Sequence, residues 1–413
     1  MPTRSGRDVV VPLRRRPPAF EQGRPLNAVI VGAGVIGLAC AWRAGRQGLR
    51  VRVLERDEPG AGASGVAAGM LAPVGEASWG EDSLTRLATA SARSWPSFAA
   101  ELGADSGLEP GYEARGALHV ALDGDETAEL RRRFDLMRSL EAGVRWLDRG
   151  ECRDLEPGLT PSCASGVLAP GEAAVDPGPL IGALLTAVEA RGGQVISGVE
   201  AVEALIESGR LAGVVTSDGR EHRADHVVLA AGAWSGTAPW LPSKARPPVR
   251  PVKGQVLTLR GSPDSPPCER IISSERVYLV PRVDGRLTVG ATVEERGFDV
   301  RVTAGGAHEL LREAYRALPD ISELELVDAL AGLRPGTPDN VPLIGPAELD
   351  GLLLATGHHR NGILLAPLTA AAIAAHLTGE PPPAPVELAH PGRFGDRAAP
   401  GLVSAPALRE PPP

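Results

Sequence analysis

Short blocks of apolar residues begin at residue 27, and the first of them predict a strand, a helix and a second strand. Residues 28–31 are all apolar and lead into a glycine-rich turn, after which apolar residues continue to Cys40. A second apolar strand, residues 51–54, follows this helix. Because short apolar runs bounded by glycine are typical of buried strands, residues 27–58 are predicted to form the βαβ opening of a parallel sheet.

Helical spacing of apolar residues recurs further along the chain. Apolar residues at positions 84, 87, 88 and 92 fall on one helical face and predict a helix over residues 83–103. Similar patterns predict further helices at 126–140, 177–192, 308–318 and 361–376.

Strands are predicted where apolar runs are short and end at glycine, proline or aspartate. They are expected at residues 112–122, 195–202, 213–216, 226–236 and 352–357, with a succession of short strands over 249–293. The segment 226–236 combines a buried strand with a glycine-rich loop, and Asp218–Gly219 predicts a hairpin turn.

The order of these elements predicts a nucleotide-binding sheet assembled from separated pieces of chain. Strand-plus-glycine segments return near 226–236 and 352–362, and a β-rich stretch lies between them. We therefore expect an α/β (α+β) fold with a Rossmann-like domain and a β-rich antiparallel substrate domain. The expected boundaries are a disordered basic arm over 1–25, the first domain over 27–82, 150–240 and 326–390, the second over 83–149 and 241–325, and a Pro-rich tail over 392–413.

Three glycines after the first strand form the spacing G-x-G-x-x-G. Gly32 permits a tight turn, Gly34 lets a pyrophosphate approach the backbone, and Gly37 lets the helix pack closely on the strand. The N–H groups at the start of that helix then face the phosphates. Glu55 ends the second strand, at the distance from the glycines where an acid accepts the ribose 2′-hydroxyl. The pattern predicts an adenine-dinucleotide site, argues against NADP, and leaves FAD and NAD open.

Composition excludes several classes of function. The chain has 413 residues, of which 43% are hydrophobic and 23% charged, so it can bury a large core. A net charge of −8 offers no field for nucleic acid or an anionic membrane surface, and no uninterrupted apolar run is long enough to span a membrane. The four cysteines are scattered without metal-ligand spacing, so neither a metal site nor an oxidising compartment is expected.

Four further segments, taken with the glycine motif, carry a resemblance to a known family. They are residues 63–73 (ASGVAAGMLAP), 277–282 (VYLVPR), 331–337 (AGLRPGT) and 357–366 (GHHRNGILLA). In this order they resemble the D-amino-acid oxidase family of flavoproteins, and within it most closely the glycine oxidases of the thiamine pathway. The resemblance covers roughly residues 27–380.

The resemblance implies a bound FAD. It places the dinucleotide turn at Val35–Ile36, the ribose acid at Glu55 and an adenine-side contact at Val202. Small residues over 63–70 would let a planar ring lie against backbone. Since residues 334–345 hold no cysteine, where covalent relatives attach flavin, FAD is expected to be non-covalent. The expected cofactor-binding residues are Gly32, Gly34, Val35, Ile36, Gly37, Glu55, Arg56, Ala63, Ser64, Ala68, Gly69, Met70, Val202, Gly232, His358, His359, Asn361, Gly362, Ile363 and Leu364.

The predicted last helix begins near Asn361–Gly362, and the resemblance aims this end at the pyrimidine end of the flavin. Free N–H groups and the helix dipole there would stabilise the negative charge of reduced flavin, by about 0.3–1 kcal/mol per interaction. His358 and His359 are expected to line the flavin loop rather than act as acid and base. Without the resemblance, the same helix is simply a packing element.

Arg334, Tyr278 and Arg360 are the expected catalytic and substrate-binding residues. Arg334 follows an apolar run, where an unpaired charge is unfavourable, so it has an internal carboxylate partner or awaits a ligand. The resemblance assigns its fork to the substrate carboxylate, which accepts two parallel hydrogen bonds from a guanidinium. It assigns Tyr278 to the same carboxylate and Arg360 to the amine side. Arg276 stands where close relatives often carry histidine, and a cation near the mouth of the site would alter substrate choice.

The resemblance implies an FAD-dependent amino-acid oxidase that acts first on glycine and yields imine, then glyoxylate, ammonia and hydrogen peroxide. Its partners would be a small amino acid and dioxygen, without nucleic acid or membrane, in a cytoplasmic homo-oligomer that supplies thiazole synthesis. Three alternatives remain open. They are an oxidase for sarcosine, proline or larger D-amino acids, a dehydrogenase with another electron acceptor, and a non-catalytic flavin-binding protein.

Overall fold

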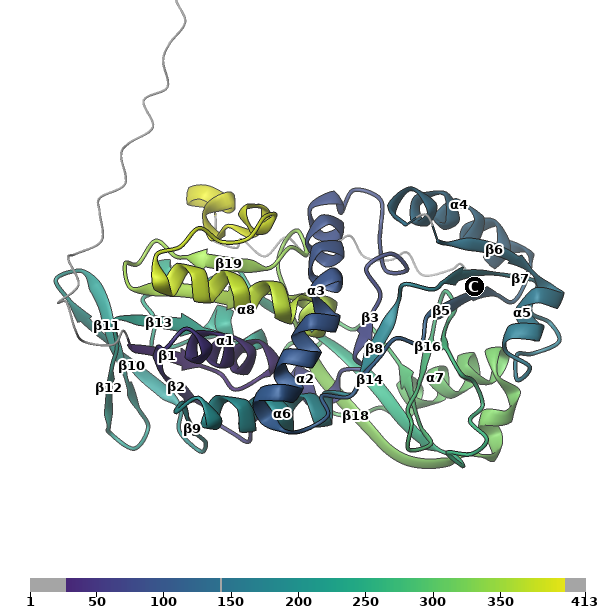
Figure 1. Ribbon diagram of the computed structural model, residues 1–413, viewed down its shortest axis with the longest axis horizontal. Coiled ribbons are helices and arrows are strands. Elements are labelled where there is room, and N and C mark those ends of the chain that lie inside the picture. The colour runs from purple at the N-terminus through teal and green to yellow at the C-terminus, as the bar shows by residue number, and fades with distance from the viewer. Residues whose placement is uncertain (1–26, 142, 398–413) are drawn as a thin grey trace, which may run out of the picture.

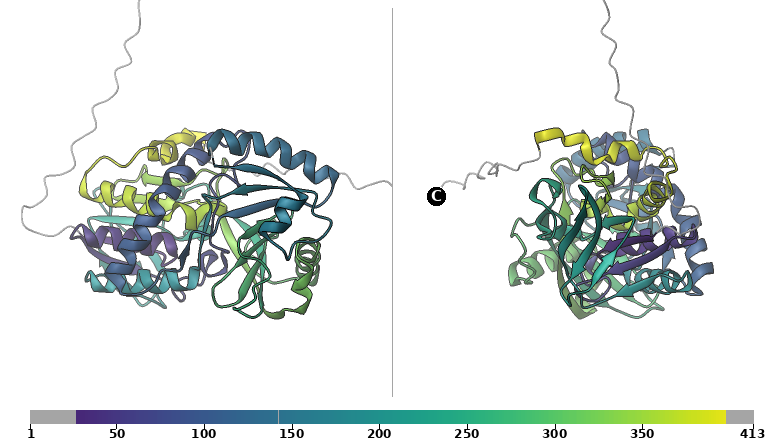
Figure 2. Two further views of the ribbon diagram at one scale, coloured as in Figure 1. Left: turned by 45° about the vertical axis from the view of Figure 1, so that its right-hand side comes forward. Right: turned by 90° about the vertical axis from the view of Figure 1, so that its left-hand side faces the viewer.

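The computed structural model describes residues 27–141 and 143–397. The predicted arm, residues 1–25, lies outside them, as does the predicted tail beyond residue 397. Two large sheets lie on opposite sides of the molecule, and helices cover both (Figures 1 and 2). The predicted α/β class, with a nucleotide-type sheet and a mainly antiparallel sheet, is confirmed.

The first large sheet has six strands and contains the predicted βαβ opening. In spatial order the strands are β19 (Leu343–Pro346), β20 (Leu352–Thr356), β13 (His226–Leu229), β1 (Asn27–Val31), β2 (Arg50–Leu54) and β9 (Gln194–Ile196). All neighbours are parallel except β19 and β20. The central strands are buried on both faces, as their uninterrupted apolar runs predict.

Four helices pack on one face of this sheet and share its largest apolar core. They are α1 (Val35–Arg46), α3 (Asp82–Ser106), α6 (Pro177–Ala190) and α8 (Gly362–Thr378). The other face packs against a small sheet. Its strands are β10 (Ala201–Glu207), β11 (Arg210–Thr216) and β12 (Glu221–Arg223).

Two sequence predictions concern this small sheet. The hairpin at Asp218–Gly219 joins β11 to β12 and is confirmed. The single strand predicted over 195–202 is wrong, because β9 and β10 are separate strands in different sheets. Gly198, with φ of +73°, turns the chain between them.

Pro367 interrupts the hydrogen bonding inside α8, and α3 compensates for it. A proline within a helix lacks the N–H donor and its ring displaces the preceding turn. The Ser91 hydroxyl of α3 donates to the Leu364 carbonyl at 2.7 Å and accepts the Leu368 N–H at 3.4 Å. Trp95 Nε1 donates to the same carbonyl at 3.0 Å. These bonds fix α3 against α8 (Figure 1).

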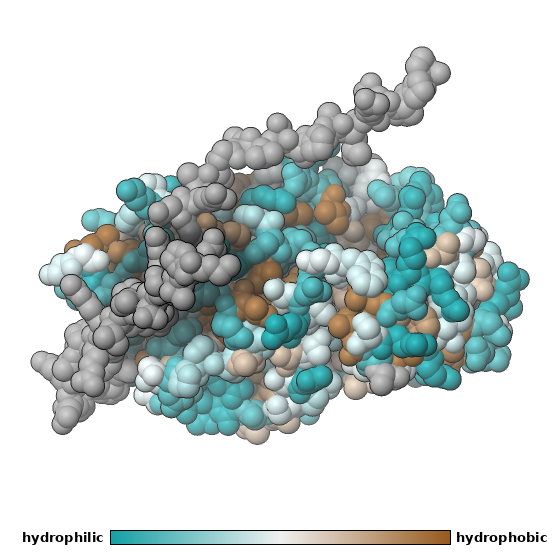
Figure 3. Space-filling view, turned by 90° about the horizontal axis from the view of Figure 1, so that it is seen from above, coloured by the Kyte–Doolittle hydropathy of each residue, from teal (hydrophilic) through white to brown (hydrophobic). Residues whose placement is uncertain are grey.

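One segment of the described residues, His359–Thr378, is long and apolar enough to cross a membrane by length and composition. It contains α8, and 78% of it is buried within the fold, where α8 packs against α1 and α3. The face of the molecule seen in Figure 3 mixes polar and apolar residues. The apolar character of this segment is therefore accounted for by packing in the core.

The second large sheet has eight strands, antiparallel except between β15 and β5. In order they are β18 (Glu325–Gly336), β14 (Arg250–Arg260), β17 (Arg286–Gly290), β16 (Tyr278–Pro281), β15 (Ile271–Ser273), β5 (Ala117–Ala121), β7 (Ser165–Ala169) and β6 (Arg145–Asp148). β14 has 11 residues and is longer than the short strands predicted over 249–293.

The remaining elements are three helices that pack against the eight-stranded sheet, one short helix, a small sheet and several 3-10 turns. They are α2 (Ala63–Val66), α4 (Gly124–Leu140), α5 (Arg149–Leu155), α7 (Ala304–Ala317), a small sheet of β3 (Met70–Leu71), β8 (Ala173–Val175) and β4 (Tyr112–Glu113), and 3-10 turns at 232–237, 243–245, 319–323, 359–361, 386–389 and 391–397.

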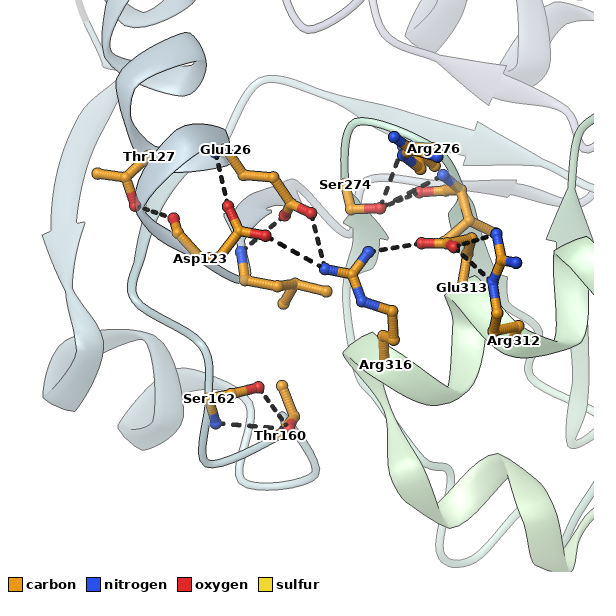
Figure 4. Close-up of polar contacts among 12 residues, drawn as sticks. Asp123, Glu126, Thr127, Thr160, Ser162, Ser274, Arg276, Arg312, Glu313 and Arg316 are labelled. Carbon is orange, nitrogen blue, oxygen red and sulfur yellow. Dashed lines mark hydrogen bonds and ion pairs between the residues drawn. The ribbon is translucent and has the colours of Figure 1, made fainter. Parts of the chain in front are cut away.

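An arginine links the helices on the second sheet (Figure 4). Arg316 of α7 binds Glu126 at 3.0 Å and pairs with Asp123 at 3.5 Å, both at the start of α4. Its other terminal nitrogen binds Glu313 at 2.7 Å. The contacts join two segments that are far apart in the sequence and hold α4 and α7 together.

Three elements pack in a different part of the fold from the domain to which the sequence analysis assigns them. α3 packs with the six-stranded sheet, although residues 83–149 are expected in the substrate domain. β7 and β18 belong to the eight-stranded sheet, although both fall in segments expected in the nucleotide domain. The start of the expected tail is also part of the fold, since Arg393 pairs with Asp339 at 2.8 Å. The periodicity of an element predicts its type but not the sheet on which it packs.

Candidate functional site

A cavity of about 700 Å³ lies where the two large sheets meet. Its walls include the ends of β1 and β2, the loop around α2, and residues of β14, β16 and β18. The start of α8 closes a further side. The cavity therefore brings together segments from the beginning, the middle and the end of the described chain.

The glycine motif forms one end of this cavity. Gly32 has φ of +110°, and a Cβ on it would collide with the Ala230 carbonyl. A Cβ on Gly37 would collide with the Gly32 carbonyl, so this glycine sets the close packing of α1 that the sequence predicts. The Val35 N–H at the start of α1 donates to Ser64 Oγ at 3.0 Å. Backbone and small side chains thus leave room for a bulky, charged group at the helix terminus.

Glu55 stands at the end of β2 and faces the same cavity. Its carboxylate accepts the Ala33 N–H at 2.7 Å and the Asp57 N–H at 2.9 Å. Two backbone donors hold the carboxylate in place while it retains capacity to accept hydroxyl groups. The Arg56 guanidinium lies 4.8 Å from the ring centre of Trp234, a cavity residue that the sequence motifs did not indicate.

Val202 does not line the cavity, contrary to the sequence prediction. It is 46% exposed on β10. The preceding residues 199–201 line the cavity instead. The predicted contact is thus displaced by one to three residues. The sequence does not fix its position, because no pattern of apolar residues marks the break between β9 and β10.

The predicted flavin loop lies along the cavity, with Ala63, Ser64, Ala68, Gly69 and Met70 all on its wall. Gly69 has φ of +67°, and a Cβ there would collide with the Val175 carbonyl. The loop is therefore backbone-lined at its tightest point, which suits a flat ring system.

Of the cofactor-binding residues predicted near the start of α8, some line the cavity and others do not. Gly362 and Ile363 line the cavity, together with His358, His359 and Gly232. Asn361 and Leu364 do not line it. Asn361 is buried beside a separate small hollow, and the Leu364 carbonyl is used by α3.

Both histidines of this turn are neutral near neutral pH. Burial lowers the pKa of His358 to about 3, and its Nε2 lies 3.0 Å from Thr369 Oγ1. Burial, with the neighbouring Arg360, lowers the pKa of His359 to about 4. Neither is suited to exchange protons at neutral pH, in agreement with the expected lining role.

Arg334 projects from β18 at the opposite end of the cavity. Its NH1 donates to the Thr292 carbonyl at 3.0 Å and to the Lys253 carbonyl at 3.4 Å. Across residues 27–141 and 143–397, no carboxylate forms an ion pair with it. A Cβ on Gly254 would collide with the guanidinium. Backbone groups and a glycine thus position a cation and leave its charge unpaired.

Tyr278 stands beside Arg334 on the cavity wall. Its ring packs over Gly290, where a Cβ would collide with it. Burial raises the pKa of the Tyr278 hydroxyl, against an opposing effect of Arg334. The hydroxyl is therefore protonated at neutral pH and can donate a hydrogen bond to an anion bound by Arg334.

A network behind the sheet fixes the carbonyl that holds Arg334. Lys253 is 1% exposed and pairs with Glu294 at 3.5 Å. The same carboxylate accepts bonds from Thr292 Oγ1 and Gln255 Nε2, each at 2.6 Å. The sequence alone assigns no role to Lys253, because its partner lies on a separate loop after β17.

Arg360 lines the cavity but its charge is engaged. Its guanidinium pairs with Glu76 at 3.4 Å and with Glu81 at 3.1 Å. Glu76 also lines the cavity and is not indicated by the sequence, since its segment carries no motif. Burial raises the pKa of Glu76, while Arg360 opposes this shift.

The expectation of Arg276 at the mouth of the site is wrong. Arg276 is exposed in the turn before β16, where its N–H donates to Ser274 Oγ at 3.4 Å (Figure 4). It does not line the cavity. Residues two apart share a face only within a strand, and Arg276 lies in the bend before β16 begins at Tyr278, so this alternation does not bring it to the cavity.

Comparisons with known proteins agree with this geometry. A family model described as FAD dependent oxidoreductase matches residues 27–376. The glycine oxidase of Geobacillus kaustophilus is 35% identical over 353 residues, covering 84% of this chain and 92% of that protein. The bifunctional protein ThiO/ThiG of Trichormus variabilis is 37% identical over 350 residues, covering 84% of this chain and 52% of that protein. The chain thus spans about half the length of that bifunctional relative.

Solved structures give the same picture. The crystal structure of glycine oxidase from Geobacillus kaustophilus superposes with a TM-score of 0.81 at 33% identity, over 89% of this chain and 98% of that one. The structure of iminodiacetate oxidase (IdaA) from Chelativorans sp. BNC1 gives a TM-score of 0.79 at 29% identity, over 88% and 98%.

Proposed function

The chain belongs to the family of FAD-dependent oxidoreductases, and from this premise we propose that it oxidises glycine and other small α-amino acids. The overall reaction converts glycine, water and dioxygen into glyoxylate, ammonia and hydrogen peroxide. The observation that carries the proposal is Arg334, a cation in the cavity with no carboxylate partner among the described residues and with Tyr278 beside it. A guanidinium fork and a phenol together match the hydrogen-bonding capacity of one carboxylate.

The residues of the cavity fit FAD. Gly32 and Gly34 bring bare backbone to the start of α1, and Glu55 supplies a fixed acceptor for ribose hydroxyls. The N-terminus of α8, at Gly362–Ile363, presents backbone N–H groups to the far part of the cavity. When bound, FAD would supply the redox chemistry, namely acceptance of a hydride with its two electrons and transfer of these electrons to dioxygen.

The protein's own groups bind and orient the substrate. Arg334 and Tyr278 hold its carboxylate, so the neighbouring carbon is confined to one place in the cavity. His358 and His359 stay neutral, so they do not take the ammonium proton at neutral pH. The amine therefore reacts in its neutral form, and activity should rise with pH as the substrate amine loses its proton.

The proposal is tested by the absorbance of the purified protein, with and without anaerobic glycine. Flavin bands that glycine bleaches, together with glyoxylate and peroxide formed in air, are the expected result. A yellow protein that no small amine bleaches would support a non-catalytic flavin-binding role. Bleaching followed by slow reoxidation in air would indicate a different electron acceptor.

Substrate preference within this class is decided by side-by-side kcat/KM values for glycine, sarcosine, D-alanine and D-proline.

We also propose a cytoplasmic setting and a homo-oligomeric state. The similarity to a bifunctional ThiO/ThiG protein supports a role in supplying the imine to thiazole synthesis. A thiamine requirement in a strain lacking this protein would test that role.

A further inference from the structure

We infer that Glu76 restricts the site to amines that carry a single anionic group, and that it excludes amines with a second carboxylate. The inference deepens the proposed function and rests on it. It follows from the balance of charge around Arg334, Arg360 and Glu76, which line one cavity and lie close enough for both arginines to act on the Glu76 carboxylate.

The two arginines differ in what opposes their charge. Arg360 pairs with the carboxylates of Glu76 and Glu81, at 3.4 and 3.1 Å, and its NH2 also donates to the Glu76 carbonyl at 3.1 Å. Glu81 is held in turn by Asn340 Nδ2 at 2.7 Å. Arg334 donates to two backbone carbonyls and contacts the Tyr278 hydroxyl, and no carboxylate of the described residues pairs with it. Of these two arginines, Arg334 is therefore the one that, among the described residues, has no carboxylate partner and can bind an incoming carboxylate.

Glu76 is held where it stands by the buried residues behind it. The preceding N–H, of Gly75, donates to Glu172, whose side chain is fully buried and lies 3.3 Å from His119 Nε2. The Gly75 carbonyl accepts a bond from Arg133. A Cβ on Gly75 would collide with the His119 ring. Contacts of Gly75 thus anchor the backbone that carries Glu76. Burial raises the pKa of the Glu76 carboxyl, and the ion pair with Arg360 opposes this shift and stabilises the charged form.

A substrate with one carboxylate places it on Arg334. A second carboxylate on the amine side would then meet Glu76 and an arginine that already has two anionic partners. Like charges at such short range repel, more strongly where water is partly excluded. Sarcosine and iminodiacetate test this directly, because iminodiacetate is sarcosine with a carboxylate added to the N-methyl group.

The experiment compares kcat/KM for sarcosine and iminodiacetate in the FAD-loaded wild-type protein and in Glu76→Gln. The wild type should prefer sarcosine by about tenfold or more, and Glu76→Gln should reduce this preference by about tenfold, equivalent to about 1.4 kcal/mol. Glu109→Gln removes the same charge from an exposed site outside the cavity and should leave the preference unchanged. Equal use of both substrates by the wild type, or an unchanged preference in Glu76→Gln, would overturn the inference.

A binding measurement on the wild-type holoenzyme covers the case in which the variant does not fold. Acetate and malonate differ by one carboxylate, and both can be titrated by their effect on the flavin spectrum. Acetate should bind about tenfold more tightly than malonate, and equal or tighter binding of malonate would overturn the inference. A protein that oxidises neither glycine nor sarcosine contradicts the proposed function, whereas this titration still tests Glu76 separately.

Discussion

Replacing Arg334 by alanine is the sharpest test of how the site holds a substrate. In the structure its NH1 is bonded to two backbone carbonyls, at 3.0 and 3.4 Å, and the charge has no carboxylate partner among the described residues. Substrate binding would therefore complete an ion pair in a partly buried site. Removing one partner of a buried ion pair costs about 3–5 kcal/mol.

At about 1.4 kcal/mol per decade, this loss corresponds to a fall in kcat/KM on the order of 10² to 10³ or more. Arg334→Lys should also be impaired, because an ammonium group cannot donate the paired hydrogen bonds of a guanidinium. The assay is peroxide formation from glycine by FAD-loaded protein, with flavin content and Tm confirming that each variant folds.

Arg276→Ala is the matched control, since Arg276 is an exposed arginine outside the cavity and should change kcat/KM by less than about twofold. Near-normal kcat/KM for glycine in Arg334→Ala would refute the assignment of the carboxylate to this residue. A loss of equal size in Arg276→Ala would show that the assay reports charge or folding rather than the site.

The neighbours of Arg334 and the two histidines before α8 give three further predictions. Gly254→Ala should raise KM for glycine by about tenfold or more, because the new Cβ would displace the Arg334 guanidinium; an unchanged KM in steady-state assays would contradict this. Tyr278→Phe should lower kcat/KM by about tenfold to a hundredfold, as expected for one hydrogen bond to a charged group, and should bind acetate correspondingly less tightly. Burial lowers the pKa of His358 to about 3 and of His359 to about 4, so between these values and about 6.5 the unfolded chain binds more protons than the folded chain. The free energy of unfolding should therefore fall as pH drops through this window. Tm measured against pH should fall less steeply in His358→Gln than in the wild type.

Local pattern is sufficient to predict the nucleotide end of the site. The glycines at 32, 34 and 37 and the acid at 55 lie within one βαβ unit, so their spacing in sequence predicts their positions in space. The loop at 63–70 is close to that unit and also lies where expected. The prediction for Val202 is wrong because a turn at Gly198 separates two strands that the apolar pattern merges.

The substrate end requires information that the sequence pattern does not contain. β18 pairs with β14 from a distant part of the chain, and only this pairing brings Gly254 against Arg334. Glu76 and Arg360 come from opposite ends of the described chain, so no local motif indicates their ion pair. Leu326 and Leu330 are exposed in the first half of β18. Because apolar residues there do not alternate between a buried and an exposed face, the sequence pattern does not predict this half of the strand.

A crystal structure of the FAD-loaded protein with glycolate, a non-reducing mimic of the substrate, shows directly whether Arg334 and Tyr278 bind the substrate carboxylate. We predict that the glycolate carboxylate lies within hydrogen-bonding distance of both the Arg334 guanidinium and the Tyr278 hydroxyl. Glycolate bound elsewhere, with Arg334 paired to an aspartate or glutamate of the protein, would contradict it.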